Sequence, residues 1–411
     1  MDALRRQLGV VGRSPGFRLL FLATIGSTLG TLLATIALVV DVKDRTESGP
    51  WVSALFVVQF LPAVAVGLFF GPLLDRLSRR ATMIAADFVR AAVFVALVFV
   101  HSAGTIVALA TVAGFATGFF RPAAYAGLPN LVEADDLPAA NAVLQTGDNT
   151  AWAVGPVLGG VLVAALGPHP AYWINAGSFV LSGLLLAAIP AQKLQAVAAA
   201  TRGHLRDLRE GVAFVIQSAP LRTVLLAWTL AMLAIAAINA TEVFLAKDTF
   251  NGGDFGFGLM YGATGVGLAI GSLVGGRWVE VRPIALVYGG GITLLALAFG
   301  LAAISPNVWL ASLCCLLGGI GDGAAVLCNS LLVQRGAPDE MRGRAFTVIM
   351  AVNYAAFGIG FLLGGVLHAA YGARWVWGGS AIMLAGAGAC AYLLARGVPH
   401  RAAEPKPEPA V

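Results

Sequence analysis

The sequence predicts an all-α integral membrane protein in which twelve transmembrane helices form two pseudo-symmetric halves of six helices. Three observations predict this fold class. Of the 411 residues, 58% are apolar and only 11% are charged, too few charges to cover a water-soluble surface. The apolar residues fall into twelve runs, and the second half of the chain repeats the first at a constant offset. The lipid bilayer is therefore expected to be the main solvent of the chain.

The twelve runs lie between breaks that contain charged residues, Gly or Pro. Each is close to the length of about 20 residues that a helix needs to cross the bilayer. The first is too long for the apolar part of a secretory signal, so it is expected to remain as a span that ends at a loop containing Asp41. The expected spans are residues 17–40, 51–72, 81–101, 104–128, 140–166, 171–190, 220–246, 256–277, 283–303, 307–333, 345–369 and 374–395.

The distribution of Lys and Arg predicts the orientation of these spans. With the N-terminus in the cytoplasm, twenty basic residues fall in cytoplasmic segments and four in segments on the other side. This bias predicts a multi-pass plasma membrane (inner membrane) protein with both termini in the cytoplasm. The net charge of +5 is then an orientation signal, and no nucleic-acid partner is expected. Because the His residues are scattered and the Cys residues lie inside apolar runs, we expect no metal and no cofactor.

The internal repeat is visible without gaps. A shift of 205 residues places Gly155 on Gly360 and the segment 158–162 on 363–367, both of which read Leu-Gly-Gly-Val-Leu. Two six-helix halves in parallel register are expected to place a substrate site between them, near the middle of the membrane.

The repeat also predicts the division of the chain. We expect an N-terminal half at residues 1–190 and a C-terminal half at 220–396. The linker at 191–219 has apolar residues at helical spacing with charges between them, which predicts a helix in the cytoplasmic membrane interface. The tail at 397–411 is rich in Pro and charged residues and is expected to be disordered.

The segment GPLLDRLSRR at 71–80 lies where the second span leaves the membrane. It resembles the loop signature of the major facilitator superfamily, G-x-L-x-D-R-x-G-R-R, with Ser78 in place of a glycine. The alternative is a basic turn that follows the positive-inside rule, which explains the arginines but not the aspartate. The resemblance implies a gating loop formed by Gly71, Asp75, Arg76, Arg79 and Arg80.

A second motif lies in the fifth span. Gly155, Pro156, Gly159 and Gly160 resemble the antiporter signature of the same superfamily, G-x-x-x-G-P-x-x-G-G, with Ala151 at its first position. The resemblance implies export. Because proline removes a helical hydrogen bond and glycine permits close helix contacts, the segment is expected to act as a hinge. Ordinary helix packing is the alternative.

Further segments, at 17–21, 86–90, 119–123 and 338–346, resemble the macrolide-efflux and enterobactin-exporter branch of the superfamily's drug:proton antiporters. The resemblance implies an antiporter that exchanges protons for small amphipathic molecules such as drugs, macrolides or siderophores. We expect the protein to be a monomer. The chain departs from this branch at two positions. Thr31 stands where the branch often has an aspartate, and Arg121 where it has a small residue.

Ionisable residues inside spans are costly and therefore become candidates for proton or substrate coupling. Asp87 and Arg90 are three positions apart on one helix, which favours a structural pair over a transport site. Asp148 lies near the middle of its span, where it can be a proton carrier or a hydrogen-bonded structural acid. Glu242 lies near the outer end of its span, where solvation is the favoured interpretation.

Arg121 and Asp322 form the last candidate pair. The repeat places Asp322 at the depth of Thr117, one turn from Arg121, so the two residues can face each other across the halves. In the alternative, Arg121 pairs with Asp148 on the next span. Polar and aromatic residues available to line a substrate site are Phe120, Tyr125, Gln145, Asn149, Trp152, Asn239 and Asn329.

Three classes of function fit the sequence to different degrees. A secondary-active exporter accounts for the repeat, the loop signature and the antiporter segment, whereas an importer or facilitator leaves the antiporter segment unexplained. A membrane-bound enzyme or sensor fits least, because no clustered metal ligands and no soluble output domain are seen. The sequence contains no G-x-x-x-x-G-K-[ST] phosphate loop, which argues against ATP as the energy source. We therefore expect a transporter and no enzymatic activity.

The resemblance places Asp75 against the start of the eleventh span, near Arg344. A carboxylate at a helix N-terminus beside an arginine is stabilised, by about 0.3–1 kcal/mol from the dipole alone. We predict that Asp75→Asn biases the protein toward its inward-open state and slows export while expression is unchanged. Export assays in cells with matched protein levels check this, and an unchanged rate contradicts the latch.

Overall fold

The computed structural model describes residues 9–69, 77–194, 204–337 and 339–397. Its long helices are α2 (Pro15–Thr46), α3 (Gly49–Phe69), α5 (Arg79–Val98), α6 (Ala103–Gly127), α7 (Leu137–Leu166), α8 (His169–Ala187), α10 (Ala219–Phe244), α11 (Gly253–Val281), α12 (Ile284–Ile304), α13 (Val308–Gly336), α14 (Asp339–Tyr371) and α15 (Ala373–Ala395). The linker carries α9 (His204–Gln217), and α10 continues into the π-helix η4 (Leu245–Thr249).

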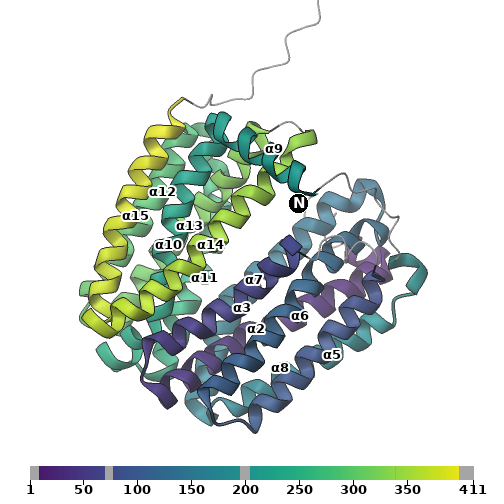
Figure 1. Ribbon diagram of the computed structural model, residues 1–411, viewed down its shortest axis with the longest axis horizontal. Helices are drawn as coiled ribbons and strands as arrows, with labels where there is room; N and C mark the ends of the chain where they lie inside the picture. The colour runs from purple at the N-terminus through teal and green to yellow at the C-terminus, as the bar shows by residue number, and fades with distance from the viewer. Residues whose placement is uncertain (1–8, 70–76, 195–203, 338, 398–411) are drawn as a thin grey trace, which may run out of the picture.

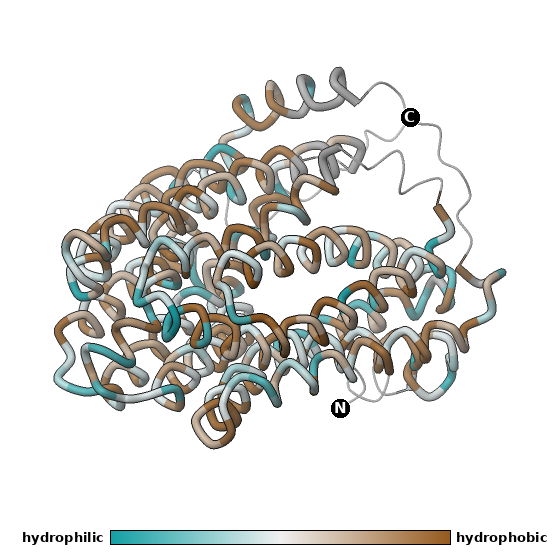
Figure 2. The backbone as a smooth tube through the Cα atoms, turned by 60° about the horizontal axis from the view of Figure 1, so that its bottom comes forward, coloured by the Kyte–Doolittle hydropathy of each residue, from teal (hydrophilic) through white to brown (hydrophobic). Residues whose placement is uncertain are grey.

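Twelve helices in the described part of the chain are long and apolar enough to cross a membrane. Figure 2 shows apolar residues along the lengths of the helices and hydrophilic residues mostly near their ends. A helix satisfies its backbone hydrogen bonds internally, so these segments can remain in lipid. The predicted twelve-span, all-helical fold is confirmed.

The two halves repeat the same packing scheme. In the first half, α2 packs on α7 and α8, α5 packs on α6 and α8, and α3 packs on α6. In the second half the equivalent helices pack in the same combinations: α10 on α14 and α15, α12 on α13 and α15, and α11 on α13. The halves meet mainly through α7 with α11 and α3 with α14 (Figure 1). These two contacts are equivalent under the repeat.

The ends of the bundle differ. We call the end that carries α9 and the start of α10 the linker end, and the end that carries Thr46, Gly49 and η4 the far end. The ribbons of the two halves approach each other most closely toward the far end (Figure 1). At the linker end, α9 packs against α14 and α10 of the second half.

The first span is longer than the sequence predicts, and the expected loop at Asp41 is wrong. α2 continues as a helix to Thr46, because its terminal charges have partners. Arg45 Nε lies 2.6 Å from Asp41 Oδ1, and the Tyr172 hydroxyl donates to Asp41 Oδ2 over 3.0 Å. A helix can carry such charges at the edge of the membrane when each is neutralised.

Glycines allow the backbones of the two halves to touch. A Cβ atom on Gly258 of α11 would lie 2.6 Å from the Cα atom of Gly160 and 2.6 Å from the carbonyl oxygen of Pro156, both on α7. At the equivalent contact, a Cβ atom on Gly365 of α14 would lie 2.6 Å from the carbonyl oxygen of Gly49 on α3. Any larger residue would force the helices apart.

Aromatic side chains pack between the halves next to these glycines, toward the middle of the molecule. We call the five rings described below the aromatic belt. Trp152 of α7 stacks on Tyr261 of α11, with ring centroids 6.2 Å apart and planes at 13°. At the equivalent contact, Phe56 of α3 stacks on Phe361 of α14 at 4.8 Å, and Phe357 packs edge-on against Phe361 at 4.7 Å. The belt therefore joins the halves on both sides of the pseudo-symmetry axis.

We predict that Gly365→Leu lowers the thermal stability of the purified protein, because its side chain would collide with Ser53 and with the Gly49 backbone. Overpacking of this kind costs about 1–3 kcal/mol. The matched control is Gly290→Leu on α12, where a Cβ atom meets nothing within 4 Å. Thermal unfolding in detergent checks the prediction, and equal midpoints for the two variants contradict it.

Candidate functional site

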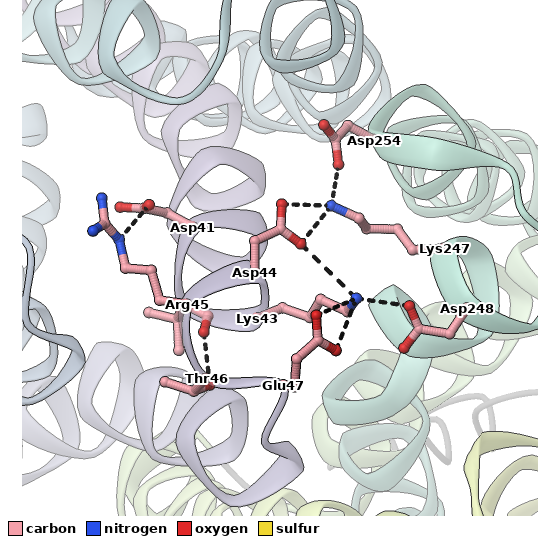
Figure 3. Close-up of polar contacts among 10 residues, drawn as sticks. Asp41, Lys43, Asp44, Arg45, Thr46, Glu47, Lys247, Asp248 and Asp254 are labelled. Carbon is pink, nitrogen blue, oxygen red and sulfur yellow. Dashed lines mark hydrogen bonds and ion pairs between the residues drawn. The ribbon is translucent and has the colours of Figure 1, made fainter.

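Charged residues join the two halves at the far end (Figure 3). Lys43 of α2, whose side chain is only 6% exposed, lies 2.6 Å from Asp248 of η4 and 3.2 Å from Glu47. Lys247 of η4 lies 2.7 Å from Asp44 of α2 and 2.5 Å from Asp254 of α11. We call these six residues the far-end charge cluster. Two of these ion pairs, Lys43–Asp248 and Lys247–Asp44, cross between the halves, with the cation in the first half in one pair and in the second half in the other. Separating the halves here therefore requires breaking both.

This cluster was not predicted from the sequence, because its charged residues were expected to lie in loops between spans. A signal was nevertheless present: the 205-residue offset places Lys43 on Asp248. Two residues that are equivalent under a pseudo-twofold axis and carry opposite charges can meet at that axis.

Asp148 lies near the middle of α7 and is 6% exposed. The Thr28 hydroxyl of α2 donates to its Oδ1 atom over 3.4 Å. The nearest cation is Arg121 of α6, whose Nη2 atom lies 3.8 Å from Asp148 Oδ2 and whose side chain is 62% exposed. The carboxylate is therefore held between three helices of the first half, with a loose and accessible counter-ion.

The structure does not bring Arg121 and Asp322 together. Arg121 pairs with Asp148, which was the alternative expectation. Asp322 of α13 has a buried Oδ1 atom without a hydrogen-bond partner in the described part of the chain. The expected pair of Arg121 with Asp322 across the halves is therefore not formed in this structure.

The expectation that Glu242 is solvated is wrong. Glu242 is 3% exposed, and its Oε1 atom is buried without a hydrogen-bond partner among the described residues. The physical reason is that the helix does not end nearby: α10 runs on through η4 to Thr249. Two further turns therefore separate Glu242 from the far end, and Tyr261 and Cys315 lie within electrostatic range of it.

Asp87 and Arg90 form a buried ion pair in the first half. Ser182 of α8 donates to the second carboxylate oxygen of Asp87 over 2.7 Å. The Arg90 guanidinium lies between the rings of Phe120 and Phe179, 4.4 Å and 4.3 Å from their centroids. These contacts join α5, α6 and α8, so the ion pair stabilises the packing of these three helices.

The gating-loop residues Gly71, Asp75 and Arg76 lie outside the described residues. Arg79 donates to the carbonyl oxygen of Ala126 over 2.8 Å. Arg80 donates to the carbonyl oxygens of Leu186 and Ala187. These carbonyls belong to the C-terminal turns of α6 and α8, where cations are stabilised by the helix dipole. Both arginines thus fasten α5 to its neighbours at the linker end.

The four residues of the antiporter motif face two different partners. A Cβ atom on Gly155 or Gly159 would collide with α2, within 2.8 Å of Leu32 Cβ and 2.7 Å of the Leu33 carbonyl oxygen respectively. Gly160 and the Pro156 carbonyl instead face α11 of the other half. The motif therefore packs α7 against both helices, and its action as a hinge stays a prediction.

We predict that Arg90→Met lowers the free energy of unfolding by about 3–5 kcal/mol, because it leaves the Asp87 carboxylate buried without a counter-charge. The double variant Asp87→Asn with Arg90→Met should recover part of the loss. Arg121→Met is the matched control, since its side chain is mostly exposed. Denaturant unfolding in detergent checks this, and equal losses for both arginines contradict it.

Comparisons with known proteins place this arrangement in a family. The model of the Major Facilitator Superfamily matches residues 20–353 and 224–411. Multidrug efflux pump Tap of Mycolicibacterium fortuitum is 28% identical over 88% of this chain and 90% of its own length. Macrolide efflux protein A of Streptococcus pyogenes is 23% identical over 82% and 85%.

Solved structures agree on the fold. A bacterial homologue of the iron transporter ferroportin in an inward-facing state has a TM-score of 0.75 at 16% identity, covering 93% of this chain and 98% of that one. A bacterial homologue of the lysosomal transporter Spinster, also inward-facing, has a TM-score of 0.73 at 13% identity with the same coverage. With its twelve spans, its repeated halves and the match of the family model, this chain belongs to the Major Facilitator Superfamily of transporters.

Proposed function

We propose that this transporter is a secondary-active exporter of small amphipathic molecules and that it exchanges them for protons. The observation that carries the proposal is the placement of the contacts between the halves. The glycine contacts, the aromatic belt and the far-end charge cluster all lie between the far end and the middle of the molecule. Arg121, with an exposed side chain, lies on the linker-end side of the belt.

The distribution of basic residues gives this arrangement a direction. The positive-inside rule assigns the linker end and both termini to the cytoplasm of the cell and the far end to the outside. The state described here is then closed to the outside and accessible from the cytoplasm. Export requires the far-end contacts to break while the linker ends of the two halves come together, the rocking motion that a two-half transporter permits.

Two carboxylates are proposed to couple this motion to protons. Asp148 has a loose partner in Arg121, and Asp322 has none among the described residues. When the linker ends close, Arg121 is proposed to move from Asp148 to Asp322. Protonation of either acid removes its attraction for the arginine and so shifts the balance between the two states.

The relatives support export over import. Two of them are a multidrug efflux pump and a macrolide efflux protein, and the α7 motif resembles the antiporter signature. Import by the same fold is the competing function, and the nucleoside transporter NupG has a TM-score of 0.69 at 16% identity. At that identity the likeness concerns the fold alone.

A resistance and accumulation screen tests the proposal directly. Cells that express the protein are expected to accumulate less of at least one dye, macrolide or siderophore than cells without it. Collapse of the proton gradient should remove the difference. Higher accumulation in the expressing cells instead favours an importer.

We predict that the double variant Asp148→Asn with Asp322→Asn loses uphill export driven by a pH gradient but keeps downhill exchange. The reason is that neither site can then bind or release a proton, while the substrate path stays open. Proteoliposomes with an imposed pH gradient measure both activities. Uphill export at the wild-type rate in the double variant rules out both acids as carriers.

A further inference from the structure

The members of the far-end charge cluster differ in which ion pairs they keep when the halves separate (Figure 3). In the first half, Lys43 keeps Glu47 of its own helix at 3.2 Å, and Asp44 keeps Lys43 at 3.9 Å. In the second half, Lys247 keeps Asp254 at 2.5 Å. Each of these five residues therefore retains a partner within its own half.

Asp248 is the exception in this cluster. Its ion pair is with Lys43 of the other half, at 2.6 Å, and no ion pair joins it to a cation of its own half in the part of the chain that the structure describes. Opening of the far end therefore removes its counter-ion. A carboxylate left in this way at the edge of the membrane favours the charged form of any nearby group that can take up a proton.

His368 of α14 is such a group, and it lies on the contact between the halves. Its Cδ2 atom is 3.0 Å from the position that a Cβ atom on Gly49 of α3 would take. Its ring packs on Phe244 of α10, with centroids 4.0 Å apart and planes at 31°. The charged groups within electrostatic range of the ring are Asp248 of η4, in the same half, and Lys43 of α2. Separation of the halves at Gly49 therefore uncovers an edge of the ring.

The closed contact favours the neutral form of this ring. The Nδ1 atom of His368 is buried and has no hydrogen-bond partner among the described residues. A neutral imidazole can leave this nitrogen without a hydrogen, whereas an imidazolium carries an N–H donor on both nitrogens. Protonation would therefore bury a charged donor without an acceptor, and the positive charge of Lys43 opposes it further. The face of Phe244 attracts a positive ring less than an unmade hydrogen bond from a charged donor costs.

We propose that His368 is a proton-binding site, neutral while the far end is closed and protonated from the outside when the far end opens. The protonated ring then replaces Lys43 as the counter-ion of Asp248. This inference rests on the orientation and the far-end opening given in the proposed function. It adds a proton site at the outer contact to the deeper acids Asp148 and Asp322.

The direction of the pH effect follows from the two states. The closed state holds a neutral ring, and the open state holds a charged ring beside a carboxylate that has lost its lysine. Proton uptake therefore offsets part of the loss of the Lys43–Asp248 pair. The ratio of open to closed molecules should rise as pH falls through the range in which histidine titrates, about pH 8 to pH 5. Acid outside the cell thus favours the outward-open state.

The test measures the separation of the halves at the far end in the purified full-length protein by double electron–electron resonance. Spin labels are attached at Ser102→Cys in the first half and Pro306→Cys in the second, both exposed at this end, after the four native cysteines are replaced by alanine. The protein also carries Asp148→Asn and Asp322→Asn, so that these acids cannot contribute to the response. No substrate is required.

In this background, a change from pH 8 to pH 5 should raise the ratio of long to short distances about ten-fold. Adding His368→Gln should reduce the rise to less than about two-fold, because glutamine keeps a polar group but does not take up a proton. Asp248→Asn should also reduce the rise, since a proton on the ring then has no carboxylate beside it. The matched control is His169→Gln, which removes an exposed histidine at the far end of the first half and should leave the rise unchanged.

The proposal is overturned if the ratio does not rise as pH falls, or if it rises equally with and without His368→Gln. Thermal midpoints show whether each variant is folded. If His368→Gln does not fold, Asp248→Asn decides, and a rise as large as that of the background overturns the proposal. Failure of the proposed function is a separate result, because it shows as absence of export for every compound in the screen and does not involve these distances.

Discussion

The backbone contacts between α7 and α11 and between α3 and α14 are the constraint on which the rest of the structure depends. At Gly160 and Gly258, and again at Gly365 and Gly49, the two halves approach so closely that no Cβ atom fits between them. Without a hydrophobic driving force between helices in lipid, close packing of small residues is what holds such surfaces together. The aromatic belt and the far-end charge cluster add to these contacts on either side. All of them must separate together if the molecule is to open at its far end.

The two halves share a fold but differ in how they neutralise their interior charges. In the first half, Asp87 and Asp148 each have an arginine within ion-pair distance. In the second half, Glu242 and Asp322 have no such partner in the described part of the chain, and each has a buried unpartnered oxygen. A repeated fold thus carries paired interior acids on one side of the axis and unpaired interior acids on the other. We propose that Asp148, with its loose partner, and Asp322, with none among the described residues, are where proton binding changes the energy of the molecule.

Much of the fold was predictable from the sequence, because span length and the repeat are local or periodic signals. The contact of Asp87 with Arg90 follows from their spacing on one helix. The environment of Glu242 was not predictable, because it depends on the continuation of α10 as a π-helix, which composition does not indicate. The pairing of Lys43 with Asp248 requires knowing that equivalent helices of the two halves meet at the axis. Such contacts are set by tertiary packing between segments about 200 residues apart.

The measurement that tests this account most directly is a reversible cross-link across the α7–α11 contact. A Cβ atom on Gly262 would lie 3.5 Å from Val157 Cβ, within the range of about 3.5–4.5 Å that a disulfide needs. The pair Val157→Cys with Gly262→Cys is introduced after the four native cysteines are replaced by alanine. Gly300→Cys with Ala381→Cys, 3.4 Å apart by the same measure but within one half, is the control.

For the Val157–Gly262 pair, oxidation should abolish transport of a substrate found in the screen, and a reductant should restore it. The control pair should transport that substrate in both the oxidised and the reduced state. Full transport by a completely cross-linked Val157–Gly262 pair would contradict the claim that the halves separate at this contact.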